Sequence, residues 1–213
     1  MKRFYVAIAM SILISLPMNA NESNLTPAVY KQPNADYSAI SKDPLISKAL
    51  DVMATTTGNY ARSAIMGSNL SGKPIKVMFK NLSGFGPNYA NDDALGMKNG
   101  SQLVIYINEK HRNAPPEALA ALLSHEAMHQ DTSNSINEET YAWTYEAQVW
   151  TELKTRQPML GSYNNIPLVR RENQIYEMFK NAKYTSRIIR QSVQSNPGYR
   201  DLPPASPGFE NVQ

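Results

Sequence analysis

The chain has 213 residues, no cysteine and a formal net charge of +3. This length allows one domain with a substantial core. Without cysteine, packing and not disulfide bonds must stabilise that domain. The small positive charge gives no reason to expect nucleic-acid binding, because part of it lies in the first three residues.

The first twenty residues have the pattern of a secretory signal peptide. Lys2 and Arg3 form a basic start, Phe4–Leu16 is a mostly apolar run, and Ala20 is a small residue at the expected cleavage site. The run is shorter than the roughly twenty residues that span a bilayer, which favours cleavage over an uncleaved anchor. Cleavage removes two positive charges and no acid, leaving +1. We expect a secreted or periplasmic protein without a stable membrane anchor or a nucleic-acid partner.

Residues 21–42 are rich in Asn, Pro and Ser, and we expect them to form a loosely structured leader. A single domain is then predicted over residues 43–195. Asp43 followed by Pro44 is typical of a helix start. Apolar residues follow at helical spacing: Ile46, Ala49, Leu50 and Met53. This spacing predicts a helix of about fourteen residues.

Two patterns predict a small sheet of about three strands, mostly antiparallel. Residues 74–80 are short, partly alternating and β-branched, which is typical of a strand. Asn99-Gly100 separates Ala94–Lys98 from Gln102–Asn108, and an Asn-Gly pair between extended segments is a strong hairpin signal. Leu103–Ile107 is almost wholly apolar, so we expect this strand to be buried on both faces.

Helices are predicted after the sheet, so the expected fold class is α+β. The first runs from about Asn113 to Gln130, the second from Asn137 to about Thr155, and a third helical stretch from Leu168 to Gln194. We interpret the basic residues of the third stretch as a solvated face and not as a binding patch. These residues are Arg170, Arg171, Lys180, Lys183, Arg187 and Arg190. The Pro-rich tail, residues 196–213, is predicted to be a strap or disordered.

Residues 125–129 read His-Glu-Ala-Met-His and fall in the first of these helices. Positions i and i+4 lie on one face of a helix, so His125 and His129 can both present a nitrogen to one metal ion. Glu126 is turned about 100° around the helix and can lie beside the metal without binding it. This arrangement is typical of a zinc hydrolase. The alternative is a pair of core histidines bonded to backbone carbonyls.

Catalytic zinc usually takes three protein ligands and a water. His111 comes before the helix begins, so a carboxylate after the motif is the better candidate. The short polar loop Asp131–Ile136 can turn the chain and lay the next helix against the first. Glu138 and Glu139 then face the motif, although either could simply be an acid that stabilises the helix N-terminus.

From Leu103 to Trp143 the chain resembles the zincin superfamily of zinc metallopeptidases, and within it the gluzincin type. The shared features are a strand, an apolar lead into His-Glu-x-x-His, and a second helix with Glu-x-x-Ala. In that family the glutamate three residues before the alanine binds zinc, so Ala142 selects Glu139. Asn-Glu also recurs in some members and would select Glu138; we favour Glu139.

Two departures from the family pattern concern this second helix. The gap between His129 and the glutamate is short, and Trp143 stands where several members carry an acid that orients a histidine. By composition we expect four apolar residues of the helix to be core rather than pocket. They are Trp143, Tyr145, Val149 and Trp150.

The resemblance implies a zincin-like fold and an exported zinc peptidase, with Zn²⁺ held by His125, His129 and Glu139. Glu126 would act as general base while metal-activated water attacks a peptide bond. The peptide or protein substrate would bind as an added strand at a sheet edge, for which Ala94–Lys98 is a candidate. An oxyanion-stabilising side chain is also needed. The candidates are His111, Tyr163, Tyr176 and Tyr184.

Two other functions stay open. One is a non-peptidase zinc hydrolase that cleaves another kind of amide at the same site. The other is a non-catalytic helical interaction protein in which the motif is a coincidence or a relic.

Overall fold

The computed structural model describes residues 35–130 and 133–207. The predicted signal peptide, most of the predicted leader and residues 208–213 of the tail lie outside the described residues. Among the described helices, none combines the length and the apolar character that a membrane crossing requires.

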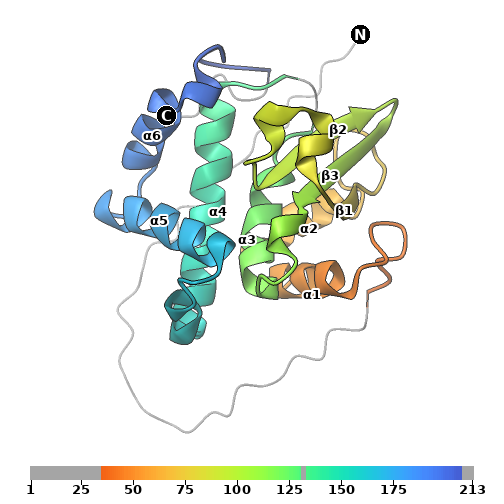
Figure 1. Cartoon of the computed structure of the whole chain (residues 1–213), viewed down its shortest axis with the longest axis horizontal. Helices are drawn as coiled ribbons and strands as arrows, with labels where there is room; N and C mark the ends of the chain where they lie inside the picture. Colours follow the sequence, from red (N-terminus) through yellow and green to blue (C-terminus); the bar gives the residue numbers. More distant parts are fainter. Residues whose placement is uncertain (1–34, 131–132, 208–213) are drawn as a thin grey trace, which may run out of the picture. The chain divides into compact units, whose positions relative to one another are not determined.

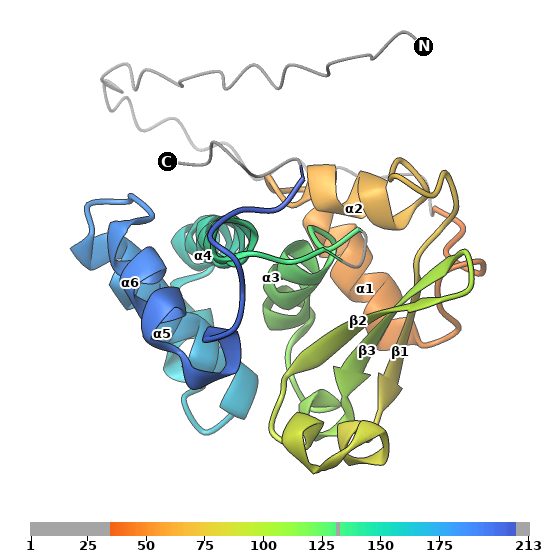
Figure 2. The same cartoon turned by 90° about the horizontal axis from the view of Figure 1, so that it is seen from above.

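The fold is α+β, as predicted, and the described residues form three strands and six α-helices (Figure 1). The strands are β1 (Lys76–Lys80), β2 (Ala94–Asn99) and β3 (Gln102–Asn108). The helices are α1 (Pro44–Met53), α2 (Asn59–Ile65), α3 (Pro116–Glu126), α4 (Ile136–Arg156), α5 (Pro167–Asn181) and α6 (Arg187–Ser195). Helices α1 and α3 lie next to the sheet, α4 lies beside α3, and α5 and α6 lie on the far side of α4 (Figure 2).

The sheet is mixed, so the prediction of a mostly antiparallel sheet is wrong. Its strand order is β1-β3-β2. Strands β2 and β3 form the predicted antiparallel hairpin, which turns at Gly100 with a φ of +61° that glycine adopts readily. After β1 the chain forms β2 at the opposite edge of the sheet and then returns as β3 between the two. Strand β3 runs antiparallel to β2 and parallel to β1. Strand β2 is consequently an edge strand.

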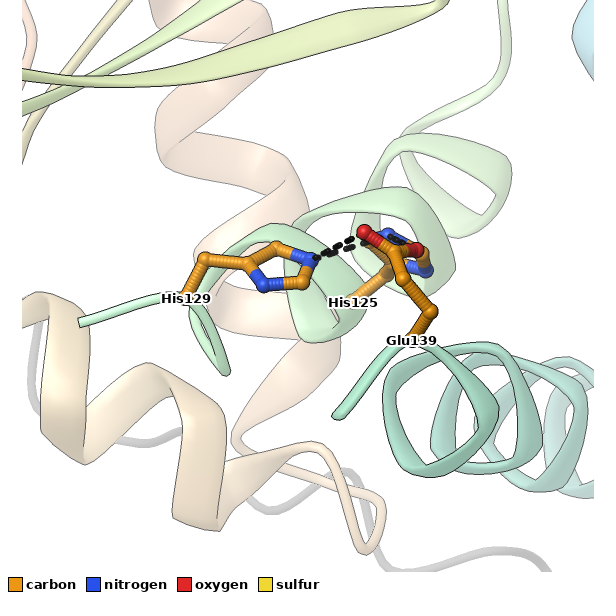
Figure 3. A group of neighbouring side chains, drawn as sticks. All are labelled: His125, His129 and Glu139. Atoms are coloured by element: carbon orange, nitrogen blue, oxygen red, sulfur yellow. Dashed lines mark hydrogen bonds and ion pairs between the residues drawn. The ribbon is translucent and has the colours of Figure 1, made fainter. Parts of the chain in front are cut away.

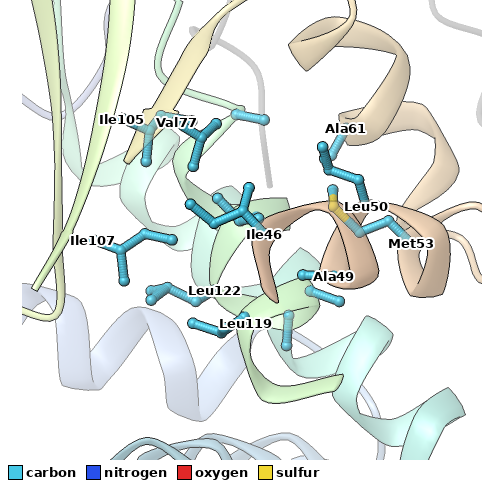
Figure 4. Packing of buried hydrophobic residues seen from close by; sticks show 14 of the residues in the cluster. Ile46, Ala49, Leu50, Met53, Ala61, Val77, Ile105, Ile107, Leu119 and Leu122 are labelled. Atoms are coloured by element: carbon cyan, nitrogen blue, oxygen red, sulfur yellow. The ribbon is translucent and has the colours of Figure 1, made fainter. Parts of the chain in front are cut away.

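The main core lies between the sheet and helices α1 and α3 (Figure 4). The apolar residues predicted to line one face of the first helix are all fully buried: Ile46, Ala49, Leu50 and Met53. They face apolar side chains of α3 and of the two adjacent strands, which are Leu119, Leu122, Val77, Ile105 and Ile107. Strand β3 is buried on both faces, as its apolar sequence predicts.

Two of the predicted helices are interrupted. Helix α1 stops at Met53, and the separate short helix α2 follows it. The third helical stretch is divided into α5 and α6, because Lys183 and Tyr184 both adopt positive φ angles between them. Such angles break a right-handed helix. The periodic apolar pattern continues across this break, and for that reason the sequence predicts one helix.

Both segments that flank the predicted domain contribute to the described fold. Tyr37 and Ile40, in the predicted leader, are each only 5% exposed and join the main core. Residues 196–207 form a strap, one of the two predicted states of the tail. Its Pro203 and Pro204 carbonyls accept hydrogen bonds from the backbone N–H groups of Ile136 and Asn137, at 2.9 and 3.1 Å. The strap therefore satisfies donors in the first turn of α4 that have no partner within the helix.

Replacing Leu50 by alanine should measure how strongly this core stabilises the fold. Leu50 is 0% exposed, and we expect Leu50→Ala to lower the free energy of unfolding by about 2–5 kcal/mol. Leu70→Ala is the matched control because Leu70 is 75% exposed, and its effect should stay within about 0.5 kcal/mol. Urea denaturation followed by circular dichroism measures both, and equal effects would contradict the described packing.

Candidate metal centre

The His-Glu-x-x-His motif lies where helix α3 ends. The α-helix stops at Glu126, so the predicted extension to Gln130 is wrong. The N–H groups of Met128 and His129 instead bond to the carbonyls of His125 and Glu126, three residues back. Helices commonly tighten in this way at their C-terminus. The turn keeps the two imidazole rings together, with their centroids 5.2 Å apart.

Three donor groups converge beside this turn (Figure 3). The Nε2 atoms of His125 and His129 are 3.3 Å apart. Glu139, on the first turns of α4, places Oε1 3.6 Å from Nε2 of His129 and Oε2 3.8 Å from Nε2 of His125. The three residues, of which His125 and Glu139 are buried, could together hold a metal ion.

The distances and the hydrogen bonding both fit a bound metal. Tetrahedral ligands about 2.1 Å from zinc lie about 3.4 Å from one another, close to the observed separations. Oε2 of Glu139 is buried and has no hydrogen-bond partner. Such an unsatisfied carboxylate oxygen is costly in a protein interior. A cation between the three groups would remove this cost.

Each histidine also has a carboxylate at its other ring nitrogen. Glu138 Oε1 lies 2.9 Å from Nδ1 of His129, and Glu146 Oε2 lies 3.2 Å from Nδ1 of His125. The contact of His129 is a hydrogen bond, whereas Nδ1 of His125 makes no hydrogen bond among the described residues and lies only at ion-pair distance from Glu146. A carboxylate that accepts the Nδ1 proton, as Glu138 can for His129, leaves the Nε2 lone pair free for a metal. Glu139 and Glu138 therefore take different positions: Glu139 adjoins the two Nε2 atoms, and Glu138 contacts Nδ1 of His129.

Glu146 was not among the predicted residues. It lies seven residues after Glu139, two helical turns along the same face of α4, and this spacing could have identified it. It is fully buried and forms a two-pronged ion pair with Arg171 of α5, in which Nη2 lies 3.1 Å from Oε2. Burial raises the pKa of Glu146, but Arg171 and His125 outweigh it and bring the pKa to about 2.

The prediction of a solvated basic face is wrong for Arg171. Its side chain is 19% exposed, and its Nε lies 3.0 Å from Asp93 Oδ2, just before strand β2. It thereby links the sheet to Glu146 and, through Glu146, to His125. Arg190 is half-buried. The remaining four residues of the set are exposed and fit the prediction: Arg170, Lys180, Lys183 and Arg187.

The surroundings of the site favour positive charge. Burial lowers the pKa of His129, but the hydrogen bond with Glu138 and the charges of Glu139 and Glu126 outweigh it and raise the pKa to about 9. An environment that holds a proton so strongly also suits a divalent cation. Burial raises the pKa of Glu126, which makes its carboxylate a stronger base.

A cavity of about 890 Å³ opens beside the three donors. Its lining includes residues 94–98 of edge strand β2, Trp143 of α4 and Tyr199 of the strap. Glu126 also lines it, and a Cβ atom added to Gly96 would come within 3.7 Å of its Oε2. The carboxylate predicted to act as a base therefore faces the edge strand across a short gap.

The cavity is lined by residues that the sequence does not single out for this purpose. Trp143 is only half-buried and lines it, although we predicted a core position, whereas Val149 and Trp150 are core residues as predicted. Tyr199 also lines the cavity, and nothing in the Pro-rich tail indicates this role. The four predicted oxyanion-stabilising candidates are absent from the lining: His111, Tyr163, Tyr176 and Tyr184. His111 is instead buried against Asp93, with 2.7 Å between Nε2 and Oδ1.

No family model, curated protein or solved structure matches this chain.

The two adjacent glutamates should differ in their effect on metal binding. We expect about one zinc per chain in the wild type, and no zinc in His125→Ala or Glu139→Ala because a ligand is lost. Glu138→Ala should still bind one zinc, with an affinity about 10–100-fold lower because His129 loses its orienting partner. Metal content by mass spectrometry and competition with a chelator measure these effects. Loss of zinc in Glu138→Ala but not in Glu139→Ala would reverse the assignment.

Removing Arg171 should destabilise the protein, because the fully buried carboxyl groups of Glu146 and Glu172 would lose the cation that contacts both. We expect Arg171→Met to lower the free energy of unfolding by about 3–5 kcal/mol at pH 7, as measured by urea denaturation. The control Arg170→Met, at the exposed neighbouring residue, should lower it by less than about 0.5 kcal/mol.

The effect of Arg171→Met should also depend on pH. The pKa of Glu146 is lowered from 4.5 to about 2 in the fold, so its stabilising contribution is fully present above about pH 4.5 and is lost as the pH falls through about 2. The difference between wild type and Arg171→Met should therefore shrink over this interval. Urea denaturation at several pH values tests this, and a difference that is constant down to pH 2 would speak against the ion pair.

Proposed function

We propose that this protein is an exported zinc-dependent peptidase. The observation that supports it most strongly is the convergence of three donors with Glu126 and an edge strand around one cavity. His125, His129 and Glu139 would hold the zinc ion. Zinc bound there would supply Lewis-acid chemistry, polarising a carbonyl group and making water more acidic.

Glu126 would act as the general base of the reaction. It is 7% exposed, borders the cavity, and has a pKa that burial raises. A carboxylate with a raised pKa accepts a proton more readily at neutral pH. In peptide hydrolysis Glu126 would take the proton that the attacking water loses and pass it to the nitrogen of the departing amine.

Strand β2 would bind the substrate backbone. It pairs with β3 along one edge, and residues 94–98 along its length line the cavity. An extended peptide can add to such an edge through main-chain hydrogen bonds. Because Gly96 has no side chain, a peptide paired there could bring its backbone close to Glu126. This arrangement favours a peptide substrate over other amides.

Tyr199 is the strongest candidate for stabilising the developing negative charge on the substrate oxygen. Burial raises the pKa of its phenol, as does the nearby Glu139, so the hydroxyl stays protonated and can donate. It lines the same cavity as β2 and the three donors. A neutral donor fixed in this position would act on the charge that forms during the reaction.

Export is part of the proposal and rests only on the sequence of residues 1–20, which lie outside the described part of the chain. The basic start, apolar run and small residue at the cleavage site support it.

Glu126→Gln should separate catalysis from metal binding. We expect this variant to fold and bind zinc like the wild type, but to cleave a peptide library about 10²–10⁴-fold more slowly because it lacks a general base. Glu117→Gln, in the same helix, is the matched control and should retain full activity. A chelator should abolish wild-type cleavage, and zinc should restore it. Mass spectrometry of the library also identifies the preferred cleavage site.

The same experiment distinguishes the other functions. Peptides left intact by zinc-loaded wild type would contradict the peptidase proposal. Zinc-dependent cleavage of non-peptide amides alone would favour the alternative hydrolase. A folded protein that binds no metal would favour a non-catalytic interaction protein.

A further inference from the structure

The C-terminal strap contacts the candidate metal centre through one buried hydroxyl group. Ser206 is 6% exposed, and its Oγ lies 2.9 Å from Oε2 of Glu138 and 3.0 Å from Oγ of Ser135. Oε1 of the same Glu138 lies 2.9 Å from Nδ1 of His129. The strap is therefore connected to His129 by two successive hydrogen bonds.

The hydrogen-bonding capacity of each group fixes the direction of this connection. The ionised carboxylate of Glu138 can only accept, so Ser206 donates its single hydroxyl proton to Oε2. Ser135 then uses its own proton in the contact with Ser206, while its oxygen accepts the backbone N–H of Glu138 at 3.0 Å. Every donor is used once, and both oxygens of Glu138 are satisfied in a site where Glu138 is 3% exposed.

We propose that Ser206 is a positioning residue for the metal centre, which holds Glu138 against His129 and away from the metal. This inference rests on the proposed function, because it requires that His129 and Glu139 bind the metal. Glu138 directly precedes Glu139, and without a partner for Oε2 its carboxylate can rotate toward another donor or toward the cation. His129 then loses the partner that fixes its ring and its Nδ1 proton. The hydroxyl of Ser206 prevents this rotation.

Backbone hydrogen bonds of the strap hold Ser206 in place beside Glu138. The Pro203 and Pro204 carbonyls bond to the first backbone N–H groups of α4, two and three residues before Ser206. Ser135, the N-cap of α4, is also hydrogen-bonded to the hydroxyl group of Ser206. The end of the chain is thus fixed at the same helical turn that carries Glu138 and Glu139, and Ser206 cannot shift independently of them.

Metal affinity in the full chain tests the proposal. We expect Ser206→Ala to weaken zinc binding by about tenfold, the lower end of the range for groups that orient a ligand. Zinc binding is measured by competition with a chelator, and the visible spectrum of the Co²⁺-loaded protein should change because the geometry of His129 changes. Ser206→Thr should restore both, since it keeps the hydroxyl. Ser195→Ala, which removes an exposed serine of α6, should behave like the wild type.

A double mutant separates a positioning role from a general structural one. If Ser206 acts through Glu138, adding Ser206→Ala to Glu138→Gln should change zinc affinity by less than about twofold, because the effects of coupled residues do not add. If Ser206→Ala folds poorly, Ser206→Val and Ser206→Thr provide a pair of equal shape that differs in the hydroxyl. Unchanged affinity in Ser206→Ala, or full additivity in the double mutant, would overturn the proposal while leaving the metal site intact. A wild-type protein that binds neither Zn²⁺ nor Co²⁺ would overturn the proposed function as well.

Discussion

His125 and His129 each have a buried carboxylate beside Nδ1, at 3.2 and 2.9 Å, and their Nε2 atoms both face Glu139. Glu146 fills this position for His125, and Glu138 fills it for His129. An imidazole ring whose one nitrogen is held in this way has only the other nitrogen to offer. The two remaining nitrogens face each other beside Glu139, so three donors meet at one point although they come from two segments of the chain.

The same pairing concentrates negative charge in a buried region. Glu126, Glu138, Glu139 and Glu146 surround the two histidines, and Arg171 is engaged with Glu146. Buried carboxylates without a compensating cation are strongly destabilising. The environment therefore raises the pKa of His129 to about 9, or equally favours a divalent cation between the donors. This excess of charge argues against the simpler interpretation of His125 and His129 as core histidines bonded to carbonyls.

The cavity depends on segments that are far apart in the sequence. Strand β2, helix α4 and the strap all contribute to its lining, and Arg171 of α5 contacts both Asp93, just before β2, and Glu146 of α4. The strap also accepts hydrogen bonds from backbone N–H groups in the first turn of α4, the helix that carries Glu139. Residues of the tail thus belong to the site itself and not to an appendage.

The sequence by itself determined the features that rest on local spacing. The i, i+4 pair of histidines, the helix start before Glu138 and the Asn-Gly hairpin all depend on neighbours within a few residues, and the structure contains each of them. The choice between Glu138 and Glu139 was different. Adjacent helical residues point about 100° apart, so local spacing could not separate them; the resemblance favoured Glu139, and the packing of α4 against α3 places Glu139 beside the Nε2 atoms.

Tertiary structure alone decided the remaining parts of the site. Arg171 has the same local pattern as its exposed neighbour Arg170, and its burial follows from charges on α4 and before β2. Tyr199 and Ser206 lie in a segment without periodicity, where no local rule assigns a position. The parallel pairing of β1 with β3 likewise depends on where the chain returns to the sheet. These features are set by contacts between distant residues, and such contacts leave no signal in the spacing of residues along the chain.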